Sequence, residues 1–517
     1  MTEEQLKKNL RNREWRLNNL YFIKNKKGER IQFKMNWAQQ ILFDNLWYLN
    51  IILKARQLGI TTFFCLLYLD DVIFNGYDAG LIAHTREAAE KIFDTKIRYA
   101  WDNLPESIKR EYQVNADSAR ELQFKLGNTT SSIYVGTSLR SGTVQRLHWS
   151  EASTVDQKYP AKAEEIRTGA LNTVHKGQIV SIESTAKGDY GIFAEFCKTA
   201  MDLAKTKRTL TEMDYKFFFF PWYKDPEYKL EAPLIIPTAL KDYFSSIERQ
   251  EGIVLSEAQK KWYFKKSVNQ KEAMKSEYPS TPEEAFTASI EGAYYGKQMD
   301  RIMEQGRIMS VPWIPELPVD TWWDLGIAAK KKDAMSIIFT QDVGLEIHII
   351  DFYGNSGEGL QHYIKYLNEK PYVYGSHWAP HDIEMKELGT GKTRLEMAQR
   401  MGLNFNTLPR IGFIDGIDAV RVTLDRCWFD EEKTQELFKA LKAYRKEWDD
   451  VLGRFKDRPL EDWSCDASDA MRMLAVGHRE NVLLDPFRDY VDEDPRFRKR
   501  LPEEKIKVNP LNPFGDI

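Results

Sequence analysis

A polar turn between an apolar strand and an apolar helix is the first place where side chains could act on a phosphate. The stretch is LWYLNIILKARQLGITTFFCLLYL, residues 46–69. Backbone N–H groups at the start of such a helix bind phosphate. Against the pattern GxxxxGK[ST], Gly59 is the second glycine and Thr61 is the hydroxyl for magnesium. The spacing predicts a nucleotide site, although a purely structural strand-turn-helix fits the local sequence as well.

This turn lacks the usual lysine. Ile60 occupies the lysine position, and Lys54 occupies the position of the first glycine. A phosphate cradle needs a cation near the β- and γ-phosphates, and Lys54 could reach across the loop to supply it, assisted by Arg56.

A second element, LHWSEA, resembles the strand that holds the acids of a nucleotide site. Such a strand ends in two acids, the first for magnesium and the second to orient the attacking water. Here the pair is Ser150 and Glu151, so the water-orienting acid is present and the metal acid is replaced. Ser150 holds magnesium through a water or not at all, and the alternative for Glu151 is a surface carboxylate. Arg140 or Arg146 could act on a neighbouring subunit's γ-phosphate, but a single arginine often only forms a salt bridge.

A third element, IVSIESTAKGDYGIF, ends a strand at Ser184 and Thr185 before a glycine-containing turn. It resembles a helicase motif that couples the γ-phosphate to domain motion, and Thr185 is the candidate for that role.

The second half of the chain contains aspartates at predicted strand ends and on the last helix: Asp324 in TWWDLG, Asp351, Asp382 in WAPHD, and Asp466 and Asp469 in DWSCDASDAMR. Acids from adjacent strand ends and a facing helix can hold two divalent ions roughly 3.5–4 Å apart, which cut a phosphodiester. Oxygen ligands favour magnesium or manganese. Burial of an aspartate within an apolar strand is costly without a partner, so Asp324 is expected to be functional or paired.

The elements around these residues alternate in type. Between 33 and 225, short apolar runs alternate with amphipathic helices, which predicts buried parallel strands at 46–53, 79–83, 132–135, 178–182 and 216–220. From about 318, the order is strand-strand-strand-helix-strand-helix-strand-helix, with helices expected at 416–427, 434–448 and 467–476. This is the order of the RNase H-like fold. In between, Ser256 with Gln259, and Thr281 with Glu284, predict capped helices.

The chain of 517 residues is long enough for several domains. Its 74 Lys and Arg against 77 Asp and Glu give a net charge of −3, so DNA would be held by local patches. The four cysteines have no paired spacing for zinc or a disulfide framework. No apolar run approaches the ~18 residues of a membrane span, and the start lacks the apolar core of a signal peptide. A reducing cytoplasm is expected, and a secreted enzyme, a membrane transporter or a zinc protein is not.

The motifs KARQLGITT, LHWSEA and ESTAKGDYGIF, followed by WDLG, PHD and DWSCDASDAMRM, resemble the large terminase subunit of tailed bacteriophages over roughly residues 33–480. In that family a lysine at the front of the phosphate loop is a recurrent variant. The resemblance implies an α/β chain with an N-terminal P-loop ATPase domain on a parallel sheet, a linker subdomain and a C-terminal RNase H-like nuclease domain. The expected boundaries are an N-terminal arm (1–32), the ATPase domain (33–235), the linker (236–310), the nuclease domain (311–480) and a C-terminal tail (481–517). The arm is polar and is expected to be exposed, either as a helical adaptor or as a solvated leader.

The resemblance also assigns residues. It implies ATP as cofactor, with adenine recognised by Gln39 (Gln40 is the alternative), and Mg²⁺, with Mn²⁺ as the alternative, in both sites. The expected nucleotide-binding residues are Gln39, Lys54, Arg56, Gln57, Gly59, Ile60, Thr61 and Thr62. The expected catalytic residues of the ATPase are Glu151, Arg140 and Thr185. The metal triad of the nuclease is Asp324, Asp382 and Asp469, with Asp466 as an auxiliary ligand and Asp351 and His381 as weaker candidates.

The implied function is a viral DNA-packaging motor that translocates double-stranded DNA and an endonuclease that cuts the concatemeric genome. The implied partners are DNA, the portal protein, a small terminase subunit and other copies of the chain in a ring on the procapsid, in the host cytoplasm and without a membrane. One alternative is a metal-dependent endonuclease with a degenerate or regulatory ATPase module, and another is a scaffold with inactive sites. A second glycine-lysine motif, Gly389 to Thr393, lacks a preceding strand and is not expected to bind nucleotide; its Lys386, Lys392 and Arg394 could touch DNA instead.

Overall fold

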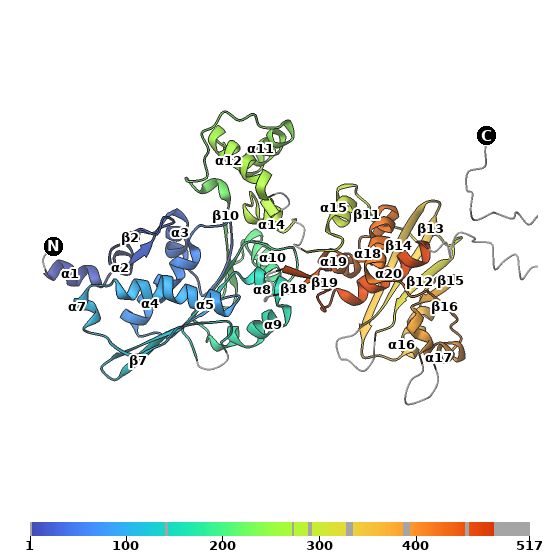
Figure 1. Cartoon of the computed structure of the whole chain (residues 1–517), viewed down its shortest axis with the longest axis horizontal. Helices are drawn as coiled ribbons and strands as arrows, with labels where there is room; N and C mark the ends of the chain where they lie inside the picture. Colours follow the sequence, from blue (N-terminus) through green and yellow to red (C-terminus); the bar gives the residue numbers. More distant parts are fainter. Residues whose placement is uncertain are drawn as a thin grey trace, which may run out of the picture. The chain divides into compact units, whose positions relative to one another are not determined.

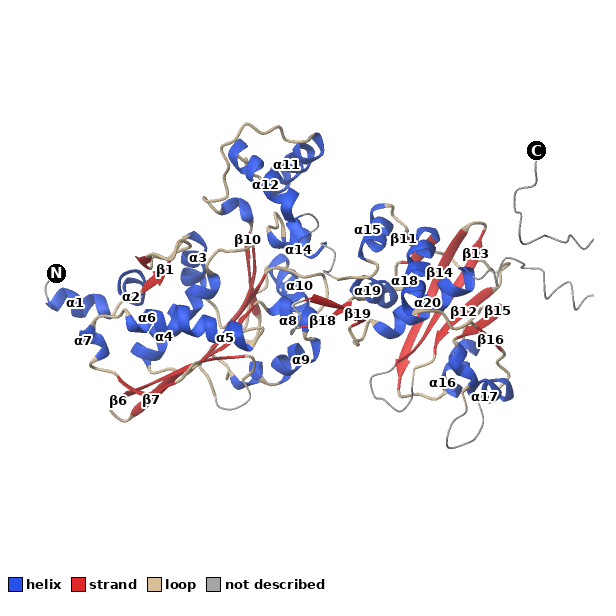
Figure 2. Cartoon of the chain, viewed as in Figure 1, coloured by secondary structure: helices blue, strands red, loops and turns tan. Residues whose placement is uncertain are grey.

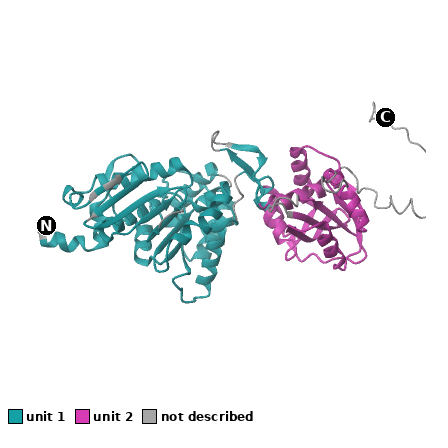
Figure 3. Cartoon of the chain, turned by 90° about the horizontal axis from the view of Figure 1, so that it is seen from below, with its two compact units in different colours: residues 1–296, 442–462 teal, residues 297–441, 463–517 magenta. Residues whose placement is uncertain are grey.

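The computed structural model describes residues 3–139, 143–270, 273–287, 292–326, 334–385, 393–449 and 454–479. The chain divides into two compact units, shown in Figure 3: Met1–Gly296 with Lys442–Asp462, and Lys297–Leu441 with Trp463–Ile517. In the parts of the chain that the structure describes, no helix is both long and apolar enough to cross a bilayer.

The first unit is built on an eight-stranded sheet of order β10-β3-β9-β8-β4-β7-β6-β5 (Figure 1). The strands from β10 to β7 are parallel to their neighbours, which confirms the predicted parallel sheet. All five predicted strands are present. Strands β5 and β6 extend the sheet by antiparallel pairing and were not predicted. The bounds are β3 Leu49–Lys54, β4 Ala79–Ile82, β5 Gln113–Asp117, β6 Glu121–Leu126, β7 Thr129–Gly136, β8 Arg146–Ser150, β9 Ile179–Ser184 and β10 Tyr215–Phe220.

Apolar clusters pack helices onto both faces of this sheet. One cluster contains most of α4, which is buried along nearly its whole length, and the other contains residues of α8, α9 and α10. The helices are α3 Trp37–Asn45, α4 Ile60–Asn75, α5 Arg86–Ile92, η1 Phe93–Arg98, α6 Tyr99–Asp102, α7 Glu106–Lys109, α8 Ala152–Lys158, α9 Pro160–Thr168, η2 Ala170–Thr173, α10 Ile192–Lys205 and η3 Trp222–Lys224. The phosphate-loop helix is therefore a central core element.

The N-terminal segment is packed, not exposed as expected. It forms α1 Glu3–Leu10, α2 Arg13–Leu20, β1 Phe22–Lys24 and β2 Arg30–Gln32. Leu17 and Tyr21 are fully buried. Arg16 is buried as well, and its guanidinium bonds to Asp70 of α4 at 2.7 Å. The basic residues that suggested a solvated arm are used to pair with acids inside the core.

The helices α11 Thr238–Glu251, α12 Glu257–Gln270, α13 Met274–Glu277 and α14 Pro282–Thr287 follow β10. Both predicted caps are confirmed. Gln259 N donates to Ser256 Oγ at 3.3 Å, and Glu284 N donates to Thr281 Oγ1 at 3.1 Å.

A hairpin from far along the sequence completes the first unit. It consists of β18 Lys446–Asp449 and β19 Arg454–Pro459. The helix predicted to reach Trp448 ends earlier, at Ala443, and the chain then becomes extended. Tyr294 N donates to Tyr444 O at 2.9 Å. Arg445, 1% exposed, donates to Gln157 O at 2.9 Å.

The second unit contains a seven-stranded sheet of order β11-β17-β14-β13-β12-β15-β16, whose strands are red in Figure 2. Strands β12, β13 and β14 are antiparallel, whereas β15 and β16 run parallel to β12. This order and these directions are those of the RNase H-like fold, as predicted. The predicted helix to Cys427 ends earlier, and Cys427 begins strand β17. The bounds are β11 Ile308–Met309, β12 Val319–Asp324, β13 Ala334–Val343, β14 Glu346–Ser356, β15 Tyr374–Ala379, β16 Phe405–Thr407, β17 Cys427–Asp430, α15 Gly296–Glu304, α16 Leu360–Asn368, η5 His381–Glu384, α17 Arg394–Arg400, α18 Phe413–Thr423, η6 Leu424–Arg426, α19 Gln435–Ala443 and α20 Cys465–Arg479.

Helix α20 lies close against β12 because a glycine stands at the contact. A Cβ on Gly477 would meet the ring of Trp322 at 2.4 Å, so a larger residue would push the helix away. Trp323, on the opposite face of the strand, packs instead toward Tyr363 of α16. The end of β12 is thus fixed on both faces.

Candidate active sites

The phosphate loop has a backbone that only its own residues allow. Gly59, the residue before α4, has φ 72°, a conformation that favours glycine. A Cβ there would also lie 2.8 Å from Gln39 Nε2. Gln39 is nearly buried; its Nε2 donates to Gly59 O at 2.9 Å and its Oε1 accepts from Asn36 N at 2.9 Å. The candidate adenine-recognising glutamine therefore contacts the loop directly, and Gln57 within the loop also has a positive φ of 63°.

Lys54 lies between two carboxylates. Its ammonium is 3.1 Å from Glu151 Oε1 and 3.1 Å from Glu183 Oε2, and the side chain is 6% exposed. Burial disfavours the charge, but the attraction of Glu151 and Glu183 is greater, so the pKa of Lys54 is raised and the side chain stays cationic. The cation predicted from the sequence is thus directed at the water-orienting acid.

Glu183 is the residue that the sequence analysis missed. It lies on β9 directly opposite Ser150 of β8 and is fully buried. Thr61 Oγ1 donates to Glu183 Oε1 at 2.7 Å, and Ser150 Oγ donates to the same oxygen at 2.8 Å. Burial alone would raise the pKa of Glu183, but Lys54 and His148 outweigh it and lower the pKa, so the carboxylate is ionised.

A signal for Glu183 existed in the sequence. It is an acid within the apolar strand IVSIES, and the cost of burying it is the same argument that singled out Asp324.

Glu151 has a strained backbone. It precedes α8 with φ 53° and ψ 45°, the left-handed region that a residue with a Cβ seldom adopts. Its side chain is 33% exposed, more open than the buried Glu183. Strain of this kind costs ~1–3 kcal/mol and concentrates at functional sites. The strain directs the carboxylate toward Lys54.

Two predicted residues of the loop have identified polar partners. Arg56 is 57% exposed and pairs with Glu277 of α13 at 3.0 Å, so its guanidinium is at the rim of the loop. Thr62 Oγ1 accepts from Lys96 Nζ at 2.6 Å.

Ile60 and Thr185 are buried; Ile60 begins α4, and Thr185 directly follows β9.

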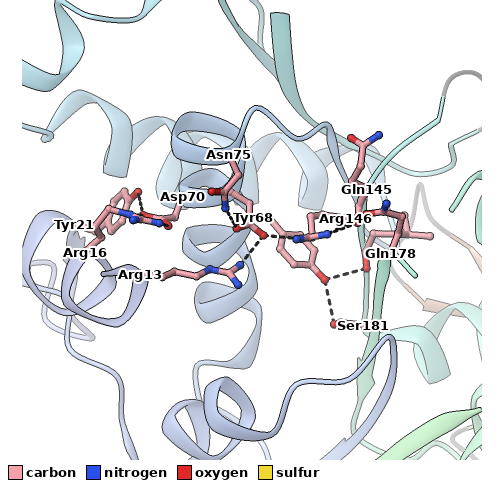
Figure 4. Close-up of polar contacts among 12 residues, drawn as sticks. Arg13, Arg16, Tyr21, Tyr68, Asp70, Asn75, Gln145, Arg146, Gln178 and Ser181 are labelled. Carbon is pink, nitrogen blue, oxygen red and sulfur yellow. Dashed lines mark hydrogen bonds and ion pairs between the residues drawn. The ribbon is translucent and has the colours of Figure 1, made fainter. Parts of the chain in front are cut away.

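The two candidate arginine fingers differ. Arg140 lies outside the described residues. Arg146 is 9% exposed, and its Nε donates to Asp71 Oδ2 at 2.5 Å. Figure 4 shows it in a network that also includes Arg13, which donates to the same oxygen at 2.6 Å. Arg146 is therefore committed within its own chain.

In the second unit, Asp324 ends β12, Asp382 follows β15 in η5, and Asp466 and Asp469 lie at the start of α20. Burial, and then the charges of Asp469, Asp466 and Asp382, raise the pKa of Asp324 well above its usual value. The fold thus brings the predicted triad and its auxiliary acid within electrostatic reach of one another. Arg472 partly offsets the negative charge and bonds to Asp469 at 2.6 Å.

These acids fit a divalent cation in chemistry. Asp382 Oδ1 is buried without a hydrogen-bond donor in the described parts of the chain. A cation would relieve both this oxygen and the charge repulsion at Asp324. Among the described residues, however, no three His, Cys, Asp or Glu side chains are already placed to hold a metal ion. The side chains would have to draw together around it.

The weaker candidates do not join this cluster. Asp351 Oδ2 accepts from Lys370 Nζ at 2.5 Å and from Tyr372 at 3.1 Å, and it is absent from the charges that act on Asp324. His381 is exposed. Lys386, Lys392 and most of the second glycine-lysine motif lie outside the described residues, while Arg394 donates to Leu325 O at 3.2 Å.

Comparison with solved structures finds large terminases. The chain is similar to the large terminase of bacteriophage HK97 at 12% identity, covering 90% of this chain and 99% of that one, with a TM-score of 0.41. For a large terminase from a thermophilic bacteriophage, the values are 13%, 87%, 100% and 0.29. For the cobalt-bound large terminase nuclease of thermophilic phage G20c, they are 14%, 36%, 96% and 0.26. No protein-family model and no curated protein matches the chain. These structures are of the family that the sequence motifs resemble, and their low scores leave the function to be inferred from the residues themselves.

Proposed function

We propose that the chain is the ATPase and endonuclease of a viral DNA-packaging motor. One observation carries this proposal: Lys54, Thr61, Glu151 and Glu183 come from β3, α4, the end of β8 and β9, and they meet at the start of α4. Ligands of open parallel sheets bind at the carboxyl ends of the strands. A lysine, a hydroxyl and acids at that position are the parts of a nucleoside triphosphate hydrolase.

Each residue then has a role. Lys54 binds the β- and γ-phosphates and on doing so exchanges its two carboxylate partners for phosphate oxygens. Glu151, released from Lys54, orients the attacking water. Thr61 binds magnesium, which neutralises charge on the phosphates when bound. Gln39 contacts adenine while it holds Gly59, and Thr185 reports the state of the γ-phosphate.

The nuclease activity belongs to the second unit. Asp324, Asp382 and Asp469, with Asp466, hold divalent cations, magnesium or manganese, that activate water and stabilise the leaving oxygen of a phosphodiester. The carboxylate repulsion at Asp324 and the unpaired oxygen of Asp382 support this assignment.

The packaging role is supported by the order of the motifs and by the presence of two phosphate chemistries in one chain. We propose that a ring of copies on the portal of a procapsid moves double-stranded DNA in the host cytoplasm. A small terminase subunit delivers the genome to it.

The test uses two acid substitutions in the full chain. Glu151→Gln should lower DNA-stimulated ATP hydrolysis by about 10²–10⁴-fold and leave plasmid nicking with Mn²⁺ intact. Asp324→Asn should do the reverse. The exposed Glu195→Gln and Asp425→Asn serve as matched controls, since these acids form only surface pairs. Loss of both activities in either active-site variant would contradict separate sites, and wild-type protein that neither hydrolyses ATP nor nicks DNA would contradict the function.

A further inference from the structure

Strand β8 ends in a serine where a nucleotide site has its metal-binding acid. The adjacent strand β9 carries an acid at the position directly opposite, Ser150 beside Glu183. We propose that Glu183 replaces the missing acid and supplies the carboxylate on the magnesium side of the nucleotide site. This proposal rests on the proposed ATPase function and identifies a residue that the motifs do not.

The contacts of Glu183 support this role. Its Oε1 accepts from Thr61 Oγ1 at 2.7 Å, the hydroxyl expected to bind magnesium, and from Ser150 Oγ at 2.8 Å. The two hydroxyls are 3.3 Å apart. In a site with an acid on β8, that acid would reach the same hydroxyl from its own strand. Here the carboxylate reaches it from the neighbouring strand, and Ser150, being small and polar, leaves room and completes the hydrogen bonding.

The second oxygen of Glu183 depends on a single cation. Oε2 is fully buried and lies 3.1 Å from Lys54 Nζ, yet no donor in the described parts of the chain makes a hydrogen bond to it. Once Lys54 turns to the phosphates, this oxygen loses its cation. A buried carboxylate in that state requires a new positive charge, because an unpaired buried charge costs several kcal/mol. Magnesium arriving with the nucleotide supplies that charge.

A purely structural role for Glu183 makes a different prediction. His148 is fully buried, stacks on Phe64 with ring centroids 4.7 Å apart, and places Nε2 3.6 Å from Glu183 Oε1. If Glu183 served only to pair with Lys54 and His148, its neutralisation would change folding but not the magnesium dependence of nucleotide affinity.

The experiment measures binding of a fluorescent ATP analogue to the full chain in Mg²⁺ and in EDTA, so it does not depend on turnover. Wild-type protein should bind the analogue more tightly in Mg²⁺ by roughly tenfold or more, the factor that ~1.4 kcal/mol gives. Glu183→Gln should lose that difference while it retains binding in EDTA. The double variant Ser150→Asp with Glu183→Gln returns the acid to β8 and should regain the difference.

The outcomes separate the possibilities. Glu183→Gln with a wild-type magnesium dependence overturns the proposal. If Glu183→Gln does not fold, the double variant decides: restored magnesium dependence supports the proposal, and its absence overturns it. Wild-type protein that binds no ATP analogue in either condition refutes the ATPase function itself, whereas binding that depends on magnesium through Glu183 supports both. The matched control, Glu195→Gln, changes an exposed acid and should behave as wild type.

Discussion

Replacing Arg146 by alanine tests whether this arginine supports the fold or acts on a neighbour's phosphate. Its guanidinium is buried, bonds to the fully buried Asp71 at 2.5 Å, and lies 4.3 Å from the centroid of the Tyr77 ring. Removing one partner of a buried ion pair costs about 3–5 kcal/mol. Arg13 remains bound to Asp71, so we expect a loss of about 2–4 kcal/mol, which includes a cation–π contribution of ~0.5–1 kcal/mol.

The assay is thermal unfolding followed by ATP hydrolysis in mixed assemblies. A loss of this size lowers the melting temperature of a large unit by roughly 5–10 °C. At a temperature where the variant is folded, its ATPase should stay within an order of magnitude of wild type, because no catalytic cation has been removed. Mixtures of wild-type and variant chains should show activity in proportion to their composition.

Two results would refute this reasoning. One is an unchanged melting temperature, which would mean that Arg146 does not stabilise the buried acid. The other is a loss of ~10³-fold or more in hydrolysis, disproportionate in mixtures, which is the behaviour of an arginine finger. Arg86→Ala is the matched control, because Arg86 is 70% exposed in a pair with Glu90, and it should leave the melting temperature unchanged.

Three buried charges give further predictions. Lys54→Met leaves Glu183 buried without its cation; it should weaken ATP-analogue binding and cost about 3–5 kcal/mol of stability, measured by urea unfolding, and unchanged stability would contradict the geometry. Asp324→Asn should raise the melting temperature in EDTA, increasingly so at higher pH, because burial and neighbouring acids raise the pKa of Asp324 and its ionised form is disfavoured in the folded state; a lower melting temperature would argue against the acid cluster. Burial raises the pKa of Asp156 to about 7, so this acid binds its proton more tightly in the folded state and its contribution to stability is lost as pH rises from about 4 to 7. Asp156→Asn should flatten that slope, worth up to ~4 kcal/mol, in unfolding measured across this range; an equally steep slope would exclude Asp156 as its source.

Apolar periodicity predicted most of the fold because buried parallel strands and amphipathic helices leave strong patterns. The strand order of the second unit followed from the order of its elements, which is confirmed by the antiparallel β12, β13 and β14. The failures are at places where tertiary pairing decided the conformation. Cys427 joins β17 and residues 446–449 join β18 because each pairs with a partner strand, which no local pattern records.

The candidate sites show the same division. Lys54 and Glu151 were identified from their places in motifs, and the structure brings their side chains within 3.1 Å. Glu183 was missed because the motif comparison expected an acid on β8, whereas the structure supplies one from the paired strand. Register between strands is a long-range property, so an acid that moves to the neighbouring strand disappears from any linear motif while its position in space is kept.

The hairpin at 446–459 has a consequence for how the protein can be divided. The chain passes between the units at 296–297, at 441–442 and again at 462–463, so a single cut cannot separate them. A truncated fragment ending at 296 would lose Tyr444, which stacks on Tyr295, and Arg445, which donates to Gln157 O, only a few residues beyond Glu151. Isolating an intact hydrolase by truncation would therefore require grafting 442–462 back through an artificial tether. Limited proteolysis at the first crossing should leave two nicked pieces that remain associated.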